Sequence, residues 1–295
     1  MTDSFSTDAV LLRRIEYGDY DLIVTYFTRS MGRISVIAKN AKKSVRRFAG
    51  ALDPFIAMNI ECSLPKRKGS LPILNRVDIE NPFPNIRTST AKTGYASYWV
   101  EIINSWMDEG KPDEAVYDLI FHVLDSLNSG KIPVEVLSVL FQIRFMGISG
   151  FTPNLLECGQ CGMPLDEIRQ HKVTFDLAAG RLICDRCSGV NGINNFPKNG
   201  CEINEIVLKY ALPEQTSLSL NYLNNVSSFG ISVSKGTLKQ LSWISSTDIR
   251  CAERLKFSRT AVKEGEHLLE GFIPCHIGRR MKSLNFLHRI RQNNV

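Results

Sequence analysis

The sequence has 295 residues, of which 43% are hydrophobic and 22% are charged, the proportions of an ordinary globular protein with a packed core. It contains no apolar run long enough to span a bilayer, and its first residues lack the basic and apolar regions of a signal peptide. The composition therefore excludes a membrane-spanning protein. We expect a cytoplasmic protein of two or three domains with no membrane partner.

The formal net charge of +6 is distributed unevenly along the chain. Residues 1–80 carry 13 Lys and Arg against 9 Asp and Glu, residues 81–248 carry 13 against 17, and residues 249–295 carry 10 against 4. Basic ends beside an acidic middle favour a polyanionic partner such as nucleic acid, although mild positive charge is weak evidence by itself.

The first eighty residues show the alternating pattern of short strands separated by turn residues. The expected strands are 9–16, 20–28, 33–39, 54–64 and 71–80. Five strands with a longer link after the third predict a five-stranded OB-fold barrel. An SH3-like barrel is the alternative that the pattern leaves open.

Two clusters of positive charge lie in the links between these strands. The first, in residues 39–48 with no acidic residue, consists of Lys39, Lys42, Lys43, Arg46 and Arg47. The second, at an expected hairpin tip, consists of Lys66, Arg67 and Lys68. Any one charge run can be a solvated surface, but two basic loops on a barrel class that binds single strands favour DNA binding through phosphate contacts.

Aromatic residues of this region are candidates for stacking on nucleic-acid bases. They are Tyr20, Tyr26, Phe27 and Phe48. Most of them are more readily explained as core residues.

After the prolines at residues 82 and 84, the hydrophobic period changes from two to 3.6, which predicts helices. The expected helices cover 95–106, 116–127, 134–148, 202–211, 236–246 and, with breaks, 248–277. The third is apolar nearly all round and should be buried, so Arg144 within it needs a partner or a route to solvent. His276 lies on an apolar face, where a histidine is more often a hydrogen-bonded core residue than a ligand or a base.

Two CxxC pairs lie 22 residues apart, Cys158 with Cys161 and Cys184 with Cys187. Each pair brings two sulfurs onto one tight turn, and two facing turns complete the tetrahedral coordination that Zn²⁺ prefers. The segment between the pairs predicts a strand from His171, a turn at Gly180 and a second strand into Cys184. This is the layout of a zinc ribbon.

Other uses of the four cysteines fit less well. Disulfides need an oxidising compartment, and a thioredoxin-type motif uses a single CxxC pair near a βαβ unit. A catalytic zinc keeps one coordination position open and has an acid or base nearby. We therefore predict one structural Zn²⁺ ion, which contributes folding free energy and no chemistry.

The sequence lacks the motifs of phosphate-binding loops, dinucleotide sites, nucleophile elbows and zinc proteases. We predict a binding protein, not an enzyme. A zinc-dependent enzyme that modifies nucleic acid and a zinc-ribbon regulator that only bridges proteins are the alternatives. The predicted fold class is α+β, with an OB-fold barrel at 1–80, a helical bundle domain at 81–156 and 201–295, and a four-cysteine zinc finger inserted at 157–200.

The order of these parts resembles the bacterial recombination mediator family RecO over essentially the full length. The matching segments are residues 32–43, 50–55, 150–162 and 276–287. The most specific is GFTPNL at 150–155 followed by CGQCG at 158–162. Some members of the family lack the four cysteines, and this sequence resembles the zinc-bearing branch.

The resemblance implies an OB-fold domain, a helical domain and an ArfGAP-like zinc finger. It implies binding to single- and double-stranded DNA, annealing of complementary strands, and a place in the cytoplasm with the nucleoid. It also implies association with RecR and with the acidic tail of single-stranded DNA-binding protein (SSB) to help load RecA. By matching segment, the implied phosphate contacts are Lys39, Lys42, Lys43, Arg46 and Arg47. Asn40 departs from the family, which favours glycine there, and this leaves the local turn in doubt.

Overall fold

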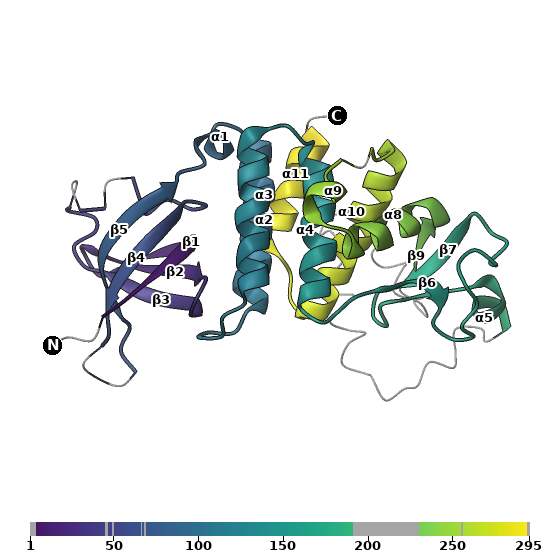
Figure 1. The fold of residues 1–295 in the computed structure, drawn as a ribbon, viewed down its shortest axis with the longest axis horizontal. Coiled ribbons are helices and arrows are strands. Elements are labelled where there is room, and N and C mark those ends of the chain that lie inside the picture. Colours follow the sequence, from purple (N-terminus) through teal and green to yellow (C-terminus); the bar gives the residue numbers. More distant parts are fainter. Residues whose placement is uncertain are drawn as a thin grey trace. The chain divides into compact units, whose positions relative to one another are not determined.

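The computed structural model describes residues 4–44, 47–48, 50–65, 67, 69–190, 230–254 and 256–293. The chain forms two compact units, one of Met1–Lys131 with Arg289–Val295 and one of Ile132–His288. Figure 1 shows the elements of each unit. The helix predicted at 202–211 lies outside the described residues, and the three predicted domain ranges stay a prediction.

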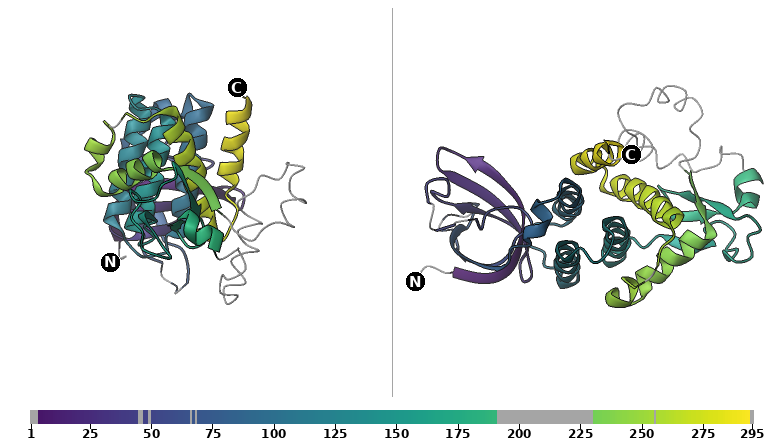
Figure 2. Two further views of the ribbon diagram at one scale, coloured as in Figure 1. Left: turned by 90° about the vertical axis from the view of Figure 1, so that its right-hand side faces the viewer. Right: turned by 90° about the horizontal axis from the view of Figure 1, so that it is seen from above.

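The first unit contains a closed barrel of five strands (Figures 1 and 2). The strands are β1 (Ser4–Tyr17), β2 (Asp21–Thr28), β3 (Gly32–Ala38), β4 (Ala57–Ser63) and β5 (Ile73–Asn81). Their order around the barrel is β1-β2-β3-β5-β4, with a parallel contact between β3 and β5 and antiparallel pairing elsewhere. This is the OB topology, so the predicted OB-fold barrel is confirmed over the SH3-like alternative.

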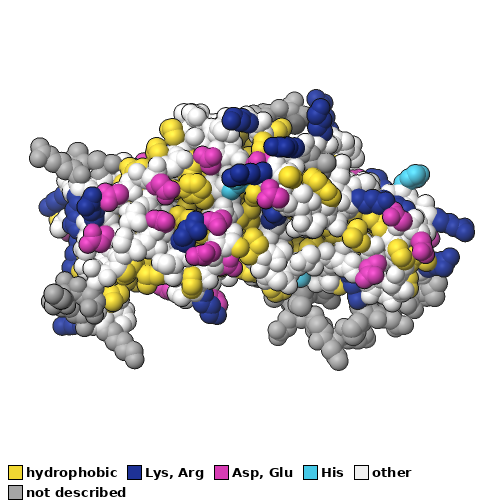
Figure 3. All heavy atoms as spheres, in the orientation of Figure 1, with side chains coloured by type: hydrophobic (Ala, Val, Ile, Leu, Met, Phe, Trp, Pro, Cys, Tyr) yellow, Lys and Arg dark blue, Asp and Glu magenta, His cyan; other side chains and the backbone are white. Residues whose placement is uncertain are grey.

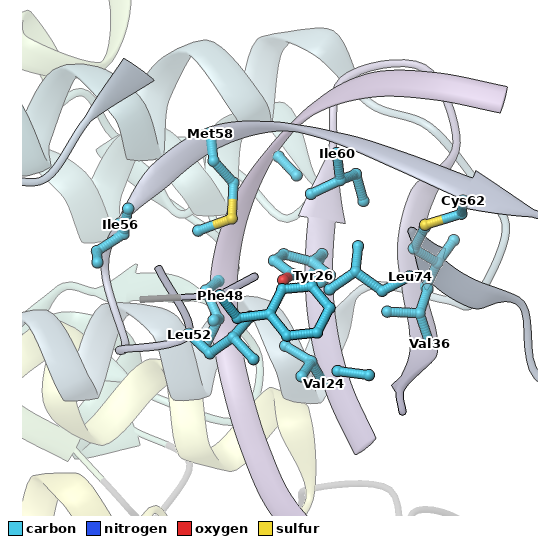
Figure 4. Packing of buried hydrophobic residues seen from close by; sticks show 14 residues of the cluster. Val24, Tyr26, Val36, Phe48, Leu52, Ile56, Met58, Ile60, Cys62 and Leu74 are labelled. Atoms are coloured by element: carbon cyan, nitrogen blue, oxygen red, sulfur yellow. The ribbon is translucent and has the colours of Figure 1, made fainter. Parts of the chain in front are cut away.

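The barrel interior is filled by side chains that alternate along the strands (Figure 4). Tyr26, Met58 and Leu74 are fully buried there, as the period of two along a strand requires. Phe48 and Leu52, from the link between β3 and β4, are 5% exposed and belong to the same cluster. The link therefore contributes to the core as well as to the surface.

Three helices of the first unit follow the barrel. They are α1 (Pro84–Arg87), α2 (Thr90–Trp106) and α3 (Glu114–Ser129). The Ser89 hydroxyl accepts a hydrogen bond from the Lys92 amide at the start of α2, and the Asp113 carboxylate accepts one from the Val116 amide at the start of α3. Gly130 ends α3 in the left-handed conformation. The first two predicted helices are thus confirmed.

The turn between β2 and β3 is fastened to these helices. Arg29 forms an ion pair with Asp118, and its guanidinium carbon lies 4.7 Å from the ring centroid of Tyr117. The Arg33 Nε donates to the Met107 carbonyl at 2.9 Å. Two arginines of the barrel therefore bind residues of the following helices, within the same unit.

Besides a short helix that is given below with the sheet, the second unit contains five described helices, the last of which continues into residues of the first unit. They are α4 (Val134–Ile148), α8 (Lys235–Ser246), α9 (Ile249–Ala252), α10 (Arg259–Ile277) and α11 (Lys282–Asn293). The predicted burial of 134–148 and the helical pattern over 236–277 are confirmed. The Arg144 guanidinium donates to the Thr247 carbonyl, and burial lowers its pKa.

A four-stranded sheet completes the second unit, with the order β6-β8-β7-β9. Its strands are β6 (Asn154–Cys158), β7 (Lys172–Asp176), β8 (Arg181–Ile183) and β9 (Gly230–Ser234), and α5 (Asp185–Val190) follows β8. The two strands predicted between the CxxC pairs are β7 and β8. The sequence pattern did not predict β6 or β9.

His276 is packed against the sheet, as predicted for a core histidine. Its Nε2 lies 3.2 Å from the Leu177 carbonyl oxygen, and its ring centroid is 4.2 Å from that of Phe272. Burial lowers the pKa of His276. Throughout the part of the chain that the structure describes, no helix combines the length and apolarity needed to cross a membrane.

Candidate metal centre and nucleic-acid interface

The pairing of β6 with β8 brings the two CxxC turns together. Cys158 ends β6, Cys184 follows β8, and the two strands run parallel with Cys158 opposite Leu182. The Gly159 amide then donates to the Leu182 carbonyl at 2.9 Å. As a result the sulfurs of the four cysteines all lie within 4.8 Å of one another.

Close backbone packing shapes the first turn of this cluster. Gly162 has a φ of +69°, and its amide donates to the Cys158 carbonyl at 2.9 Å, a conformation that favours glycine. A Cβ on Gly159 would lie 2.1 Å from the Arg181 side chain. Glycine at both positions therefore lets the chain turn back on itself beside the sulfurs.

The sulfur geometry fits a tetrahedral metal ion. Four sulfurs about 2.3 Å from a central Zn²⁺ would be about 3.8 Å apart, and the sulfurs of Cys161 and Cys184 are 3.7 Å apart. Cys158 and Cys184 are buried, Cys187 is half-buried and Cys161 is exposed. The cluster could hold one metal ion, and four thiolates are the donors that Zn²⁺ favours.

The electrostatics of the cluster also call for a cation. Burial opposes ionisation of Cys158, but backbone amides of Cys184, Cys161 and Gln160 lower the pKa of its thiol to about 6. Burial and the neighbouring sulfurs raise the pKa values of Cys184 and Cys187. One thiolate thus discourages the ionisation of the others, and a divalent cation would offset their repulsion.

The second candidate site lies where three links of the barrel converge. The Asn40 amide donates to the Asp21 carboxylate at 2.7 Å, and the Lys42 amide donates to the Tyr20 carbonyl at 3.0 Å, which joins the β3–β4 link to the β1–β2 turn. The Ile37 amide donates to the Pro72 carbonyl at 2.8 Å, next to the β4–β5 link. The β1–β2 and β4–β5 links are among those through which OB folds commonly reach oligonucleotides.

Asn40 keeps the turn that glycine would make. Its φ of +55° lies in the left-handed region, which asparagine tolerates better than most residues. The amides of Lys43 and Ser44 both donate to its carbonyl, at 3.1 and 3.0 Å. Asn40 therefore occupies a backbone conformation that glycine could also adopt.

Exposed cations gather on these links. The described residues among the predicted phosphate contacts are all exposed, and they are Lys39, Lys42, Lys43, Arg47 and Arg67. Arg46, Lys66 and Lys68 lie outside the described residues. On the face drawn in Figure 3, Lys and Arg side chains cluster over the barrel with acidic side chains among them.

The exposed lysines differ in their surroundings. Lys42 Nζ lies 2.8 Å from the Glu16 carboxylate, and this hydrogen bond and charge lower the pKa of Glu16. Lys43 Nζ lies 3.3 Å from the ring centroid of Tyr20, a cation–π contact. Within the described residues, Lys39 has no ion-pair partner. Its charge is therefore fully available to an external anion.

Arg47 both reaches the surface and anchors the link. Its Nη2 and Nε donate to the carbonyls of Leu74 and Asn75 at 2.9 and 3.2 Å, and its guanidinium lies over the Phe48 ring. These contacts fix the β3–β4 link against β5. The prediction that Arg47 meets a phosphate stays a prediction.

Sequence reasoning missed one cation of this site. Arg14 lines a groove of about 580 Å³ beside the β3–β4 link, together with Lys42 and Glu16. Its Nη1 donates to the Leu52 carbonyl and the Asp53 carboxylate, each at 2.8 Å. Arg14 was placed within an expected strand, and the signal that could have found it is the pair of adjacent arginines beside the turn.

Two family models match the chain. Their descriptions are "Recombination protein O N terminal", over residues 1–83, and "Recombination protein O C terminal", over residues 87–195 and 198–285. The chain belongs to the RecO family. Family membership confirms the resemblance drawn from the sequence and the α+β fold class of an OB-fold barrel followed by helices.

Relatives of the RecO family match over nearly their whole length. "DNA repair protein RecO" of Desulfatibacillum aliphaticivorans is 36% identical over 289 residues, which cover 98% of each chain. The protein of that name from Desulfosudis oleivorans is 34% identical over 288 residues, 97% of this chain and 98% of the relative. A third, from Geobacter metallireducens, is 28% identical over 98% of each chain. RecO is a family of DNA repair mediators, not of enzymes.

Proposed function

We propose that this RecO chain is a DNA-binding recombination mediator. It binds single- and double-stranded DNA, promotes annealing of complementary strands, and with RecR helps to load RecA onto single strands coated with SSB. The observation that carries the proposal is the convergence of three links, two of them basic, at one end of an OB barrel in a chain of the RecO family.

The proposed phosphate contacts are the cations of the β3–β4 and β4–β5 links. They are Lys39, Lys42, Lys43, Arg46, Arg47, Lys66, Arg67 and Lys68. Lys39 and Lys43 are exposed without a carboxylate partner among the described residues, whereas Lys42 must first leave Glu16. Release of counterions from the DNA supplies the favourable free energy.

Annealing follows from the same charges. Two complementary strands repel each other through their phosphates, and cations that neutralise one strand reduce the cost of bringing the second strand close. Phosphate contacts carry no sequence information, so the bases stay free to select their complement. The chain thus needs no catalytic residue for this activity.

We propose that the four cysteines hold one Zn²⁺ ion with a structural role. Bound to Cys158, Cys161, Cys184 and Cys187, the ion would join β6 to the segment after β8 and so hold the two CxxC turns together. Four sulfur donors leave no coordination position for a water molecule. The proposed protein partners, RecR and the acidic tail of SSB, rest on family membership.

Strand annealing tests the proposal. The rate at which two complementary oligonucleotides anneal is measured at low salt, with and without the cognate SSB, for the natural chain and for Lys39→Ala/Lys43→Ala. We expect the natural chain to accelerate annealing in both conditions and the double variant to lose most of the acceleration. As a matched control, Lys131→Ala/Lys263→Ala removes two exposed lysines outside the barrel, one from the link between α3 and α4 and one from α10. No acceleration by the natural chain would contradict the proposal.

A further inference from the structure

We infer that Tyr17 and Tyr20 form a base-stacking surface that makes the barrel bind single strands in preference to duplex DNA. The inference rests on the proposed DNA-binding function and deepens it, because it assigns the choice of strand type to two named side chains. Both flank the turn between β1 and β2, where Tyr17 pairs with Asp21.

The β1–β2 hairpin extends beyond the closed part of the barrel. β1 pairs with β4 only as far as Val10, and a register shift follows between Leu11 and Arg13. From there to the turn β1 pairs with β2 alone. All residues from 13 to 20 are exposed. Residues 13–20, called the arm below, therefore carry exposed side chains that are not part of the barrel core.

This arm carries large apolar side chains that folding does not explain. Tyr17 is 53% exposed and Tyr20 is 44% exposed, whereas the barrel aromatics Tyr26, Phe27 and Phe48 are buried. Exposed aromatic surface is unfavourable in water and commonly marks a binding site. The Tyr17 ring and the face of the Tyr20 ring that Lys43 does not cover are therefore available to a ligand.

Tyr20 lies beside the proposed phosphate contacts of the β3–β4 link. Tyr17 pairs with Asp21, whose carboxylate accepts a hydrogen bond from the Asn40 amide of the same link. The Lys42 amide donates to the Tyr20 carbonyl at 3.0 Å, so the arm and the basic link form one surface. Lys43 Nζ sits 3.3 Å from the Tyr20 ring centroid, which places a positive charge next to an aromatic face. A nucleotide has the complementary pair of features, an aromatic base joined to a phosphate.

Stacking on these rings would select single strands. Every base has an aromatic face, so stacking tolerates any sequence, but the face is accessible only where bases are not stacked on one another. Phosphates are present on both kinds of DNA and are contacted alike. The lysines therefore supply binding to both, and the tyrosines add affinity only for the single strand.

The test uses the full chain, the double variant Tyr17→Leu/Tyr20→Leu and three DNA probes of equal length. The probes are oligo-dT, the same oligonucleotide with abasic sites in place of thymines, and a duplex. We expect the natural chain to prefer oligo-dT over the abasic strand, and the variant to lose at least about five-fold in affinity for oligo-dT. Its affinity for the abasic strand and the duplex should be unchanged.

Two controls separate stacking from other effects. Tyr17→Phe/Tyr20→Phe keeps both rings and should retain the preference for oligo-dT. Phe286→Leu removes a ring of similar exposure, 47%, from helix α11 and should also retain it. Because Tyr17 and Tyr20 are exposed, unchanged thermal unfolding of the Leu variant is expected and confirms that it is folded.

The outcomes distinguish this inference from the function on which it rests. A Leu variant that still prefers oligo-dT to the abasic strand would overturn the inference. Equal binding of both strands by the natural chain would also overturn it, while leaving phosphate binding intact. A natural chain that binds neither strand at low salt would overturn the proposed function, and this inference with it.

Discussion

The barrel and the four-cysteine sheet are stabilised in different ways. The barrel encloses a cluster of 14 buried residues, and its strands are seven to 14 residues long, so burial of apolar surface can hold it together. The sheet has strands of three to five residues, and the turns that follow β6 and β8 meet at four sulfurs. One region depends on its core, and the other on the metal proposed for its cysteines.

This difference determines which side chains of each region can be substituted without loss of folding. The barrel core leaves the surface links available for charge and exposed rings, because neither Lys39 nor Tyr17 is needed for packing. In the sheet, the cysteines themselves are proposed to be structural. Substitutions can therefore separate binding from folding in the barrel, but not at the cysteines.

Removal of the metal should have the largest effect. Structural zinc contributes about 10–16 kcal/mol in zinc-finger peptides, which lack a core of their own, so Cys158→Ser or chelation is expected to unfold the four-cysteine sheet and to lower the temperature of the calorimetric unfolding transition of the Ile132–His288 unit. The transition of the barrel should remain. Cys251→Ser, which changes an exposed cysteine outside the cluster, should keep one metal ion per chain. Unchanged transitions after complete metal removal would contradict the structural role.

A cavity in the barrel core should destabilise the barrel and leave metal binding by the four cysteines unchanged. Leu74 is fully buried in the barrel cluster, and Leu74→Ala is expected to cost about 2–5 kcal/mol in the free energy of unfolding of the barrel. Metal content, measured by elemental analysis, should not change. Loss of metal from this variant would show that the two regions do not fold independently.

In the second unit, the Glu264 carboxylate makes a contribution to stability that should depend on pH. Its Oε2 accepts hydrogen bonds from the hydroxyls of Ser234 and Thr237, both at 2.6 Å, and its Oε1 lies 3.5 Å from Lys172 Nζ. These bonds fasten β9 and the start of α8 to α10. Glu264→Gln is therefore expected to cost about 1–3 kcal/mol at neutral pH.

The effect of Glu264→Gln should disappear in acid. Burial alone would raise the pKa of Glu264, but the hydrogen bonds from Ser234 and Thr237 and the charge of Lys172 lower it below 4.5. Its stabilisation is thus complete above pH 4.5 and is lost as the pH falls through the lower folded pKa. Denaturant unfolding of the natural chain and of Glu264→Gln is measured across this pH range. Acid affects the cysteines of both proteins alike, so the difference between their unfolding free energies reports on Glu264 alone. A difference that grows in acid would contradict the predicted direction.

The smallest expected effect concerns the ion pair between Glu16 and Lys42 of the β3–β4 link. Glu16 holds Lys42 at 2.8 Å with its carboxylate 81% exposed, and exposed pairs contribute little to stability. Glu16→Gln should leave the barrel's unfolding free energy unchanged and raise its affinity for single strands about two- to five-fold at low salt, an advantage that salt screens. Asp108→Asn, which frees Lys111 in the α2–α3 link, is the matched control and should change affinity less.

Local patterns in the sequence predicted most elements of both regions. The period of two gave the barrel strands, the period of 3.6 gave α2, α3 and α4, and the spacing of the cysteines gave the sulfur cluster, because each signal lies within a short segment. Strand pairing is not local. The SH3-like alternative was excluded only by the contact between Ile37 and Ile73, and β9 was missed because it pairs Ser234 with the distant Lys172.

Side-chain surroundings were also beyond the sequence. Alternation cannot tell a strand end that leaves the barrel from one that lines it, so the sequence did not decide that Tyr20 is the exposed member of the four candidate aromatics, and it did not predict that Arg14 belongs to the site. Nor could charge density show that Lys42 faces Glu16 or that Arg47 donates to two carbonyls of β5. The candidate site was thus predicted as a set of charges, and the structure adds the surroundings of those among them that it describes, such as Lys42, Lys43 and Arg47.

The salt dependence of single-strand binding tests the central claim most directly. Each phosphate contact contributes about 0.7 to the slope of log affinity against log salt concentration, so Lys39→Ala/Lys43→Ala/Arg67→Ala should weaken binding of oligo-dT and reduce the slope by about 2. A control variant loses the same charge from three exposed positions elsewhere, Lys131→Ala, Arg169→Ala and Lys263→Ala. The account predicts that the control keeps the slope of the natural chain. Equal slopes for all three proteins would contradict it.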